Sequence, residues 1–356
     1  MKKFLILILI LGFVAALVIP VIRGKNDDLE NVFTFDLQDN VGIKLGQSIP
    51  FKFEVLGDLN EISLEINGEK VKTWSAPSGK VNYEFNSGSL HVGSYSIVLN
   101  ATLKNGMIQT EQRTLRVLSD VTPEKWTAEI VQEHPHLESS FTQGLEFDGA
   151  VLYEGTGDPN QSGQTLVAEV DLKSGEIKRK TSLDASYFGE GISILGDELF
   201  QLTWKNGKCF VYDKNTFSLV RELKYTGEGW GLCNDDKHLI MSDGSEHIYF
   251  RDRKTFEIIK TIEVYTDQGP LNYLNELEYI EGKIYANIWT SSNIAVIDSE
   301  TGKVLAFIDA ANIVREGKGN GEVLNGVAWN KLTKKTYLTG KYWPKLFEVK
   351  VNKRAA

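Results

Sequence analysis

A pattern that recurs five times between residues 141 and 341 constrains the fold of this chain more than any other feature. Each copy begins with a short opening segment that carries one distinctive residue: Gln143, Glu190, Trp230, Asn275 and Asn325. These residues lie 47, 40, 45 and 50 positions apart. Repeats of that length are typical of one supersecondary unit stacked on copies of itself. We therefore expect a repeat architecture.

Each copy has the pattern of four short strands. The opening strand is followed by a strand rich in small or aromatic residues, then by an apolar strand, and then by a polar outer strand. In four copies an aspartate stands at or next to the end of the third strand, shortly before the residues of a hairpin turn: Asp171, Asp213, Asp252 and Asp298. Four strands per repeat predict the blade of a β-propeller.

The fifth copy lacks a fourth strand, because the chain runs out shortly after Lys353. A strand-like segment that belongs to no copy, WTAEIVQEH (126–134), precedes the first opening strand. If this segment completes the last blade, the ring closes and its exposed sheet edges disappear. We therefore predict an all-β chain with a five-bladed β-propeller over residues 123–352. An open solenoid is the alternative, and the shared blade argues against it.

The region before the propeller, residues 33–118, alternates apolar and polar residues with a period of two, and turns such as Asn67-Gly68 separate the runs. About seven short strands in such a length are typical of an immunoglobulin-like β-sandwich. No chemically suggestive motif stands out in this region. We expect a spacer or docking module, joined to the propeller by a linker at residues 121–125.

The N-terminal segment, residues 1–23, is expected to be an apolar helix. Residues 4–22 carry no charge and follow Lys2 and Lys3, and at ~1.5 Å per residue they can just span a bilayer. A secretory signal peptide and an uncleaved membrane anchor both fit; Pro20 and the lack of a small-residue cleavage site favour the anchor. Both predict an exported protein, periplasmic or facing the outside, and we expect a monomer tethered through residues 4–22 if the segment is retained.

Charge and cysteine content exclude several kinds of partner and cofactor. A net charge of −9 argues against nucleic acid and anionic membrane surfaces as partners. Cys209 and Cys233 fall in different blades, so two buried free thiols are favoured over a disulfide. No group of Cys and His has the spacing of a metal site; residues 134–136 (His-Pro-His) come nearest and are expected in a loop. We expect neither a metal nor an organic cofactor.

The residues that break the symmetry of the repeat mark the expected site. The innermost strand of each blade lines the central channel of a propeller. Six residues should converge at one end of that channel: Gln143, Glu190, Trp230 and Asn275 from opening strands, and Trp289 and Lys341 from the ends of second strands. Each has a structural explanation when taken alone, as a turn, core or strand-end residue. Glycines on both sides of Glu190 and Trp230 favour a ligand that approaches the backbone closely.

The motifs FTQGL, YEGTG, FGEGI, LTW, EGWGL, LNELEY, ANIW, LNGVAW and LTGKYWP follow one another over residues 125–350. Together they resemble the plant and bacterial glutaminyl-peptide cyclotransferases (glutamine cyclotransferases). The resemblance implies a five-bladed propeller that converts the N-terminal glutamine of peptides to pyroglutamate and releases ammonia. It also implies that Glu190 is the catalytic glutamate, and that the pocket residues are Gln143, Trp230, Asn275, Trp289 and Lys341.

The residue types can support this chemistry. The α-amine of the substrate must attack its own γ-amide carbon, so a pocket that folds the glutamine side chain supplies much of the catalysis. Glu190 can take the proton from the amine and give it to the leaving nitrogen. Asn275 or Lys341 can stabilise the oxyanion. The indoles of Trp230 and Trp289 can hold the aliphatic part of the side chain.

Two other functions fit a propeller of this kind. The first is a non-catalytic envelope protein that binds peptide termini or glycans. The second is a lactonase, which needs a channel metal held by several carboxylates; besides Glu190, the opening strands offer Glu276 and Glu278. Ammonia release from a Gln-initiated dipeptide distinguishes the cyclotransferase from both.

Overall fold

The computed structural model describes residues 31–353, and this part of the chain is built almost entirely of β-strands, with one short α-helix. The expected N-terminal helix, residues 1–23, lies outside the described residues. Within the described part, no helix has the length and apolar character needed to cross a membrane.

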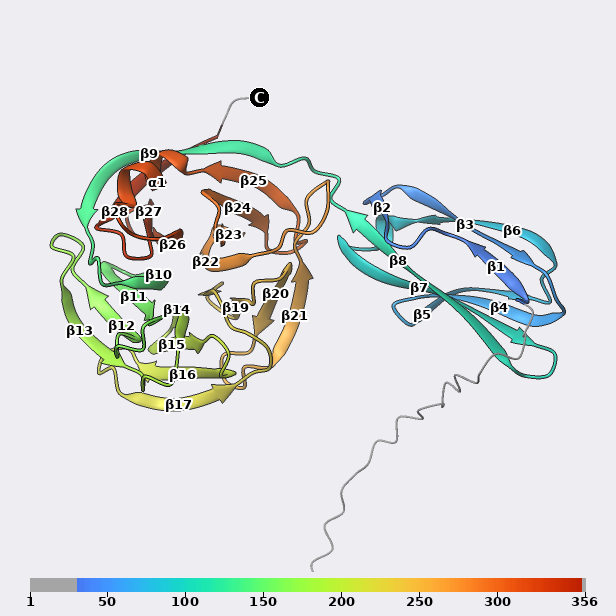
Figure 1. Ribbon diagram of the computed structural model, residues 1–356, viewed down its shortest axis with the longest axis horizontal. Coiled ribbons are helices and arrows are strands. Elements are labelled where there is room, and N and C mark those ends of the chain that lie inside the picture. The colour runs from blue at the N-terminus through green and yellow to red at the C-terminus, as the bar shows by residue number, and fades with distance from the viewer. Residues whose placement is uncertain (1–30, 354–356) are drawn as a thin grey trace, which may run out of the picture.

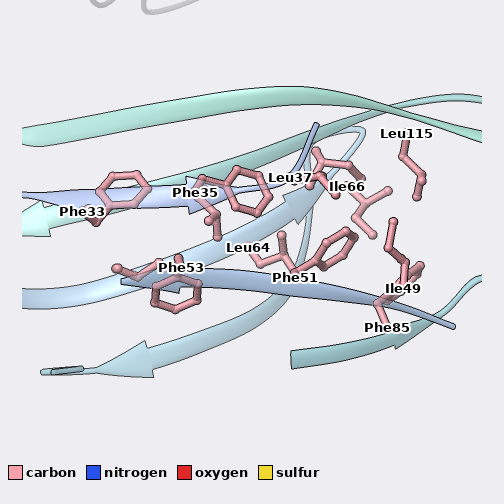
Figure 2. Close-up of a cluster of buried hydrophobic side chains, with 14 of the residues drawn as sticks. Phe33, Phe35, Leu37, Ile49, Phe51, Phe53, Leu64, Ile66, Phe85 and Leu115 are labelled. Carbon is pink, nitrogen blue, oxygen red and sulfur yellow. The ribbon is translucent and has the colours of Figure 1, made fainter. Parts of the chain in front are cut away.

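The N-terminal unit consists of two sheets that enclose one apolar core (Figures 1 and 2). One sheet contains β1 (Phe33–Asp36), β3 (Ser48–Val55) and β6 (Gly79–Asn86). The other contains β2 (Val41–Lys44), β8 (Ile108–Leu118), β7 (Gly93–Leu103), β4 (Leu59–Ile66) and β5 (Glu69–Ser75). Alternate residues point inward, as the period of two predicts, and bury Phe51, Leu64 and Ile97 completely.

Three separate four-stranded antiparallel sheets follow in chain order around a common centre (Figure 1). The first contains β10 (Phe141–Asp148), β11 (Val151–Gly157), β12 (Leu166–Val170) and β13 (Ile177–Ser182). The second contains β14 (Gly189–Leu195), β15 (Glu198–Thr203), β16 (Lys208–Asp213) and β17 (Leu219–Lys224). The third contains β18 (Leu232–Asn234), β19 (Leu239–Ser242), β20 (His247–Arg251) and β21 (Ile258–Glu263).

The remaining strands form one eight-stranded sheet that is joined through β9 (Glu124–Pro135). On one side of β9 are β22 (Leu274–Ile280), β23 (Lys283–Ile288), β24 (Asn293–Asp298) and β25 (Val304–Asp309). On the other are β28 (Lys345–Lys353), β27 (Lys335–Gly340) and β26 (Leu324–Asn330). β9 pairs with β28 of the last copy, as the sequence predicts, and this pairing is antiparallel; its parallel pairing with β25 was not predicted.

The structure differs from the sequence-based predictions in one helix, the linker and His134, and it agrees with them on the cysteines. Helix α1 (Ala311–Gly317) was not predicted; it buries Ile313 in the core beside β9. The expected linker is short, because β9 already begins at Glu124. His134 lies in β9 rather than in a loop. The cysteines are free and buried, as expected.

Buried carboxylates tie the innermost strands to one another at the centre of the ring. These strands pair along one edge only, so backbone N–H groups on the other edge face the centre. Glu276 of β22 accepts hydrogen bonds from the backbone of Leu145 in β10 (3.3 Å) and Val327 in β26 (2.7 Å). Glu146 of β10 accepts one from Ile194 in β14 (3.0 Å). These carboxylates therefore link innermost strands that do not pair with one another.

This arrangement predicts a fall in stability with rising pH. Burial raises the pKa of Glu146 from 4.5 to about 8 in the folded protein. A raised folded-state pKa gives a stability contribution that is complete below pH 4.5 and is lost as the pH rises towards 8. Denaturant unfolding at pH 5 and pH 8 should show a free energy of unfolding lower at pH 8 by on the order of 1 kcal/mol or more. Glu146→Gln should flatten this dependence; the exposed control Glu222→Gln should not, and equal slopes would contradict the assignment.

Candidate active site

The distinctive residues of the opening strands lie in irregularities of the inner strands. In β14, Gly189 pairs with Thr203 and Ile192 with Gln201, so Glu190 and Gly191 lie between the paired positions. Comparable register shifts occur at Gln143 in β10, Asn275 in β22 and Asn325 in β26. A bulge bends a strand and redirects a side chain, and bulges are frequent beside active sites. The repeat therefore places one redirected polar side chain on each of four inner strands.

The third sheet differs, because β18 begins only at Leu232. Trp230 instead donates its backbone N–H to Ser242 (3.0 Å), whose hydroxyl donates to the carbonyl of Asn275 (2.8 Å). A Cβ atom at Gly231 would collide with that same Asn275 carbonyl oxygen. Only glycine fits at this position, which explains the glycine after Trp230.

Glu190 is the buried acid of the site and is held by a short chain of amides. Its side chain is 5 % exposed. Gln143 donates from Nε2 to Glu190 Oε1 (3.0 Å), and its own Oε1 accepts from Asn325 Nδ2 (3.1 Å). Asn325 also donates to the backbone carbonyl of Thr142 (3.0 Å). Gln143 is thus positioned to orient the glutamate.

Lys341 supplies a buried cation close to this acid. The residue follows β27 directly, is 4 % exposed, and places Nζ 4.5 Å from the centre of the Phe141 ring. Its backbone N–H donates to the carbonyl of Val323 (3.0 Å). The ring and the burial shield the ammonium from water, so its charge acts strongly on its neighbours.

Burial raises the pKa of Glu190 and lowers that of Lys341, so the two pKa values move towards each other. Loss of solvation raises the pKa of Glu190 well above its usual range; the charge of Glu228 raises it further, and that of Lys341 opposes the rise. Burial lowers the pKa of Lys341, and the charges of Glu190 and Glu322 oppose that change. A buried carboxyl with a raised pKa is better suited to accept a proton and return it.

Three aromatic residues, Trp230, Trp289 and Tyr273, form a second group in the proposed site. Trp230 and Trp289 contact edge to face, with ring centres 5.9 Å apart, and Tyr273 lies 6.0 Å from Trp289. Trp289 is 43 % exposed, so it lies at the rim rather than in the core. Asn275 Oδ1 is buried and accepts no hydrogen bond from the described residues. A buried acceptor in that state is suited to a polar group of a ligand.

The structure links the predicted residues in pairs, through a hydrogen bond, a ring contact, a charge effect or an intervening residue. Gln143 and Glu190 share a hydrogen bond, Glu190 and Lys341 act on each other's pKa, and the two indoles touch. Asn275 is linked to Trp230 through Ser242.

The profile of one protein family, "Glutamine cyclotransferase", matches residues 98–351 of this chain. The chain belongs to the glutamine cyclotransferase family. The matched range begins inside β7, so it also takes in the last strands of the N-terminal unit.

Two relatives of this cyclotransferase resemble it over about two thirds of its length. The "Glutaminyl-peptide cyclotransferase" of Arabidopsis thaliana is 38% identical over 234 residues, which are 64% of this chain and 72% of that protein. The crystal structure of Myxococcus xanthus glutaminyl cyclase superposes with a TM-score of 0.61 at 35% identity. It covers 65% of this chain and 100% of that chain.

The sequence alone missed several residues around the site of this cyclotransferase. Trp204 follows β15 directly, the same repeat position that Trp289 and Lys341 occupy, and this equivalence could have revealed it. Its ring contacts that of Phe188, with centres 5.7 Å apart. Phe141, beneath the Lys341 ammonium, starts the first opening strand and carries no comparable signal.

Proposed function

We propose that this member of the family is a glutaminyl-peptide cyclotransferase. It converts the N-terminal glutamine of peptides or proteins to pyroglutamate and releases ammonia. The observation that carries the proposal is the buried Glu190 carboxyl, which Gln143 orients and whose pKa responds to Lys341. A buried carboxyl of raised pKa beside a lysine can carry the proton that intramolecular aminolysis must move.

In the mechanism, Glu190 is the general base and then the general acid. The α-amine nitrogen attacks the γ-amide carbon and loses a proton to the carboxylate. The C–N bond to the amide nitrogen then breaks as Glu190 returns that proton, and ammonia leaves. One proton moves in and out, so the enzyme ends the cycle unchanged.

The other residues bind the substrate and stabilise charge. We assign Lys341 to the oxyanion, because its buried ammonium donates three hydrogens and its charge is poorly screened. Asn275 Oδ1, the free buried acceptor, is placed to receive an N–H of the substrate. Trp230 and Trp289 hold the aliphatic part of the glutamine side chain.

The test uses the purified full chain, treated with EDTA, and a Gln-initiated dipeptide. We expect ammonia and a pyroglutamyl product, with activity unchanged by chelation, since every group in the scheme belongs to the protein. Absence of ammonia would favour the alternative, a non-catalytic envelope protein that binds peptide termini or glycans. Activity only after metal addition would contradict the mechanism.

We also propose the finer architecture. A closed five-bladed propeller over 123–352 is supported by three separate four-stranded sheets and by the division of the eight-stranded sheet at the parallel β25–β9 pair. An immunoglobulin-like sandwich over 33–118 is supported by two sheets around one core.

Location and assembly are proposed from the sequence. Residues 1–23 would serve as a signal peptide or as a membrane anchor through 4–22, and would place the enzyme in the periplasm or on the outer side of the membrane as a monomer. Cell fractionation with analytical ultracentrifugation of the extracted protein tests this; an enzyme in the cytosolic fraction, or a stable dimer, would contradict it.

A further inference from the structure

Six aromatic rings near the proposed site residues fall into two series of neighbouring rings. One runs from Tyr273 through Trp289 to Trp230, with neighbouring ring centres 6.0 and 5.9 Å apart. The other runs from Trp204 through Phe188 to Phe141, with neighbouring centres 5.7 and 5.9 Å apart. Trp204 ends one series and Trp230 ends the other.

Glu228 connects the Trp204 and Trp230 rings through a single atom. Its Oε2 accepts the indole N–H of Trp204 (2.7 Å) and the indole N–H of Trp230 (3.0 Å). Hydrogen bonds to an ionised carboxylate are shorter and stronger than those between neutral groups. An indole has one N–H, so the bond fixes the rotation of each ring as well as its position.

Lys205 and the backbone of Gly229 fix the position of Glu228 beside Trp204. Lys205 lies 3.5 Å from its other oxygen and places its ammonium 3.9 Å from the ring centre of Trp204. The backbone N–H of Gly229 donates to the carbonyl of Trp204 (2.9 Å). The segments at 204–205 and 228–230 are therefore connected through backbone, carboxylate and cation.

We propose that Glu228 is a positioning residue of the cyclotransferase, whose one carboxylate oxygen sets the orientation of the Trp204 and Trp230 indoles that wall the substrate pocket. The kinetic consequences of this inference rest on the proposed function. The orientation of the two indoles by Glu228 does not. Glu228 does not touch the reacting atoms in this scheme; it acts through the two rings.

The charge of Glu228 also affects the pKa of Glu190. The Glu228 carboxylate is one cause of the raised pKa of Glu190. Removing that charge should lower the pKa of Glu190, and so move the rising limb of the pH profile of kcat/KM to lower pH. A residue that only filled space would not move this limb.

The experiment compares Glu228→Ala with Glu228→Gln in the full chain. Alanine removes the acceptor, so the rings lose their common partner, and KM should rise by a factor of about ten or more with a smaller change in kcat. Glutamine keeps an acceptor oxygen and should hold KM within about threefold of the wild type. Both variants should move the rising limb of the pH profile of kcat/KM to lower pH.

The matched control is Glu222→Ala, which removes a carboxylate that is similarly exposed and pairs with Lys208. This variant should leave both KM and the pH profile unchanged.

Near-ultraviolet circular dichroism tests the geometry without reference to activity. Glu228→Ala should lose part of the tryptophan signal, and Glu228→Gln should retain it. The proposal is overturned if Glu228→Ala keeps the wild-type KM and spectrum, or if glutamine is as damaging as alanine to both. A wild-type protein that releases no ammonia would remove the proposed function, while the spectra would still decide whether Glu228 orders the rings.

Discussion

Replacing Glu190 by glutamine is expected to lower kcat/KM by a factor of about 10² to 10⁴, the range for loss of a general acid–base group. Glutamine matches glutamate in shape, so the pocket is kept while the proton carrier is lost. The measurement is steady-state ammonia release from a Gln-initiated dipeptide. A residual rate close to that of the wild type would rule out Glu190 as the proton carrier.

The chain offers a matched control for this variant. Glu278 is also buried, lies on inner strand β22, and accepts the backbone N–H of Trp329 (3.1 Å). Burial raises its pKa as well. Glu278→Gln should therefore affect stability more than rate, with kcat/KM within a few-fold of the wild type. If both variants lost activity equally, the effect would come from the fold and not from proton transfer.

Replacing Lys341 by methionine is expected to lower kcat by a factor of about 10² to 10³, the usual loss when one donor to an oxyanion is removed. Methionine keeps much of the apolar stem against Phe141. Because the Lys341 charge holds down the pKa of Glu190, its loss should also raise that pKa. The rising limb of the pH profile should then move to higher pH, opposite to the shift expected for Glu228 variants.

Lys345→Met is the control for the lysine. Lys345 also lies near a phenylalanine ring, 6.0 Å from the centre of Phe347, but is paired with Glu133 (2.9 Å) and is partly exposed. This variant should keep both the rate and the pH profile. An unchanged kcat in Lys341→Met would show that the oxyanion is stabilised by another group.

The sequence predicted the strands of the ring well because each repeat carries its own local signals. The aspartates after the third strands bond the turn backbone: Asp171, for example, accepts from Lys173 (2.9 Å) and Ser174 (3.0 Å). Such contacts span a few residues and can be recognised from spacing alone. Helix α1 has no side-chain N-cap and is only seven residues long, so it left no comparable signal.

The six residues proposed for the site were singled out because they occupy two equivalent positions of the repeat, in the opening strand or at the end of the second strand. What the sequence could not supply was their partners. Gln143 was expected to bind substrate directly, whereas the structure places its amide between Glu190 and Asn325. The link from Glu228 to the two indoles depends on the loop conformation that brings Trp204, 24 residues earlier, to the carboxylate that also accepts from Trp230, and no periodicity encodes that conformation.

The pairing of β9 with β28 sets an order of events during synthesis. The two strands stand at opposite ends of the ring in the sequence, yet share a long antiparallel ladder. A nascent chain can form its first sheets as they emerge from the ribosome, but the edge of β9 that pairs with β28 stays open until the strands of the intervening sheets have been translated. A chain truncated before β28 would therefore carry an unprotected, aggregation-prone strand edge.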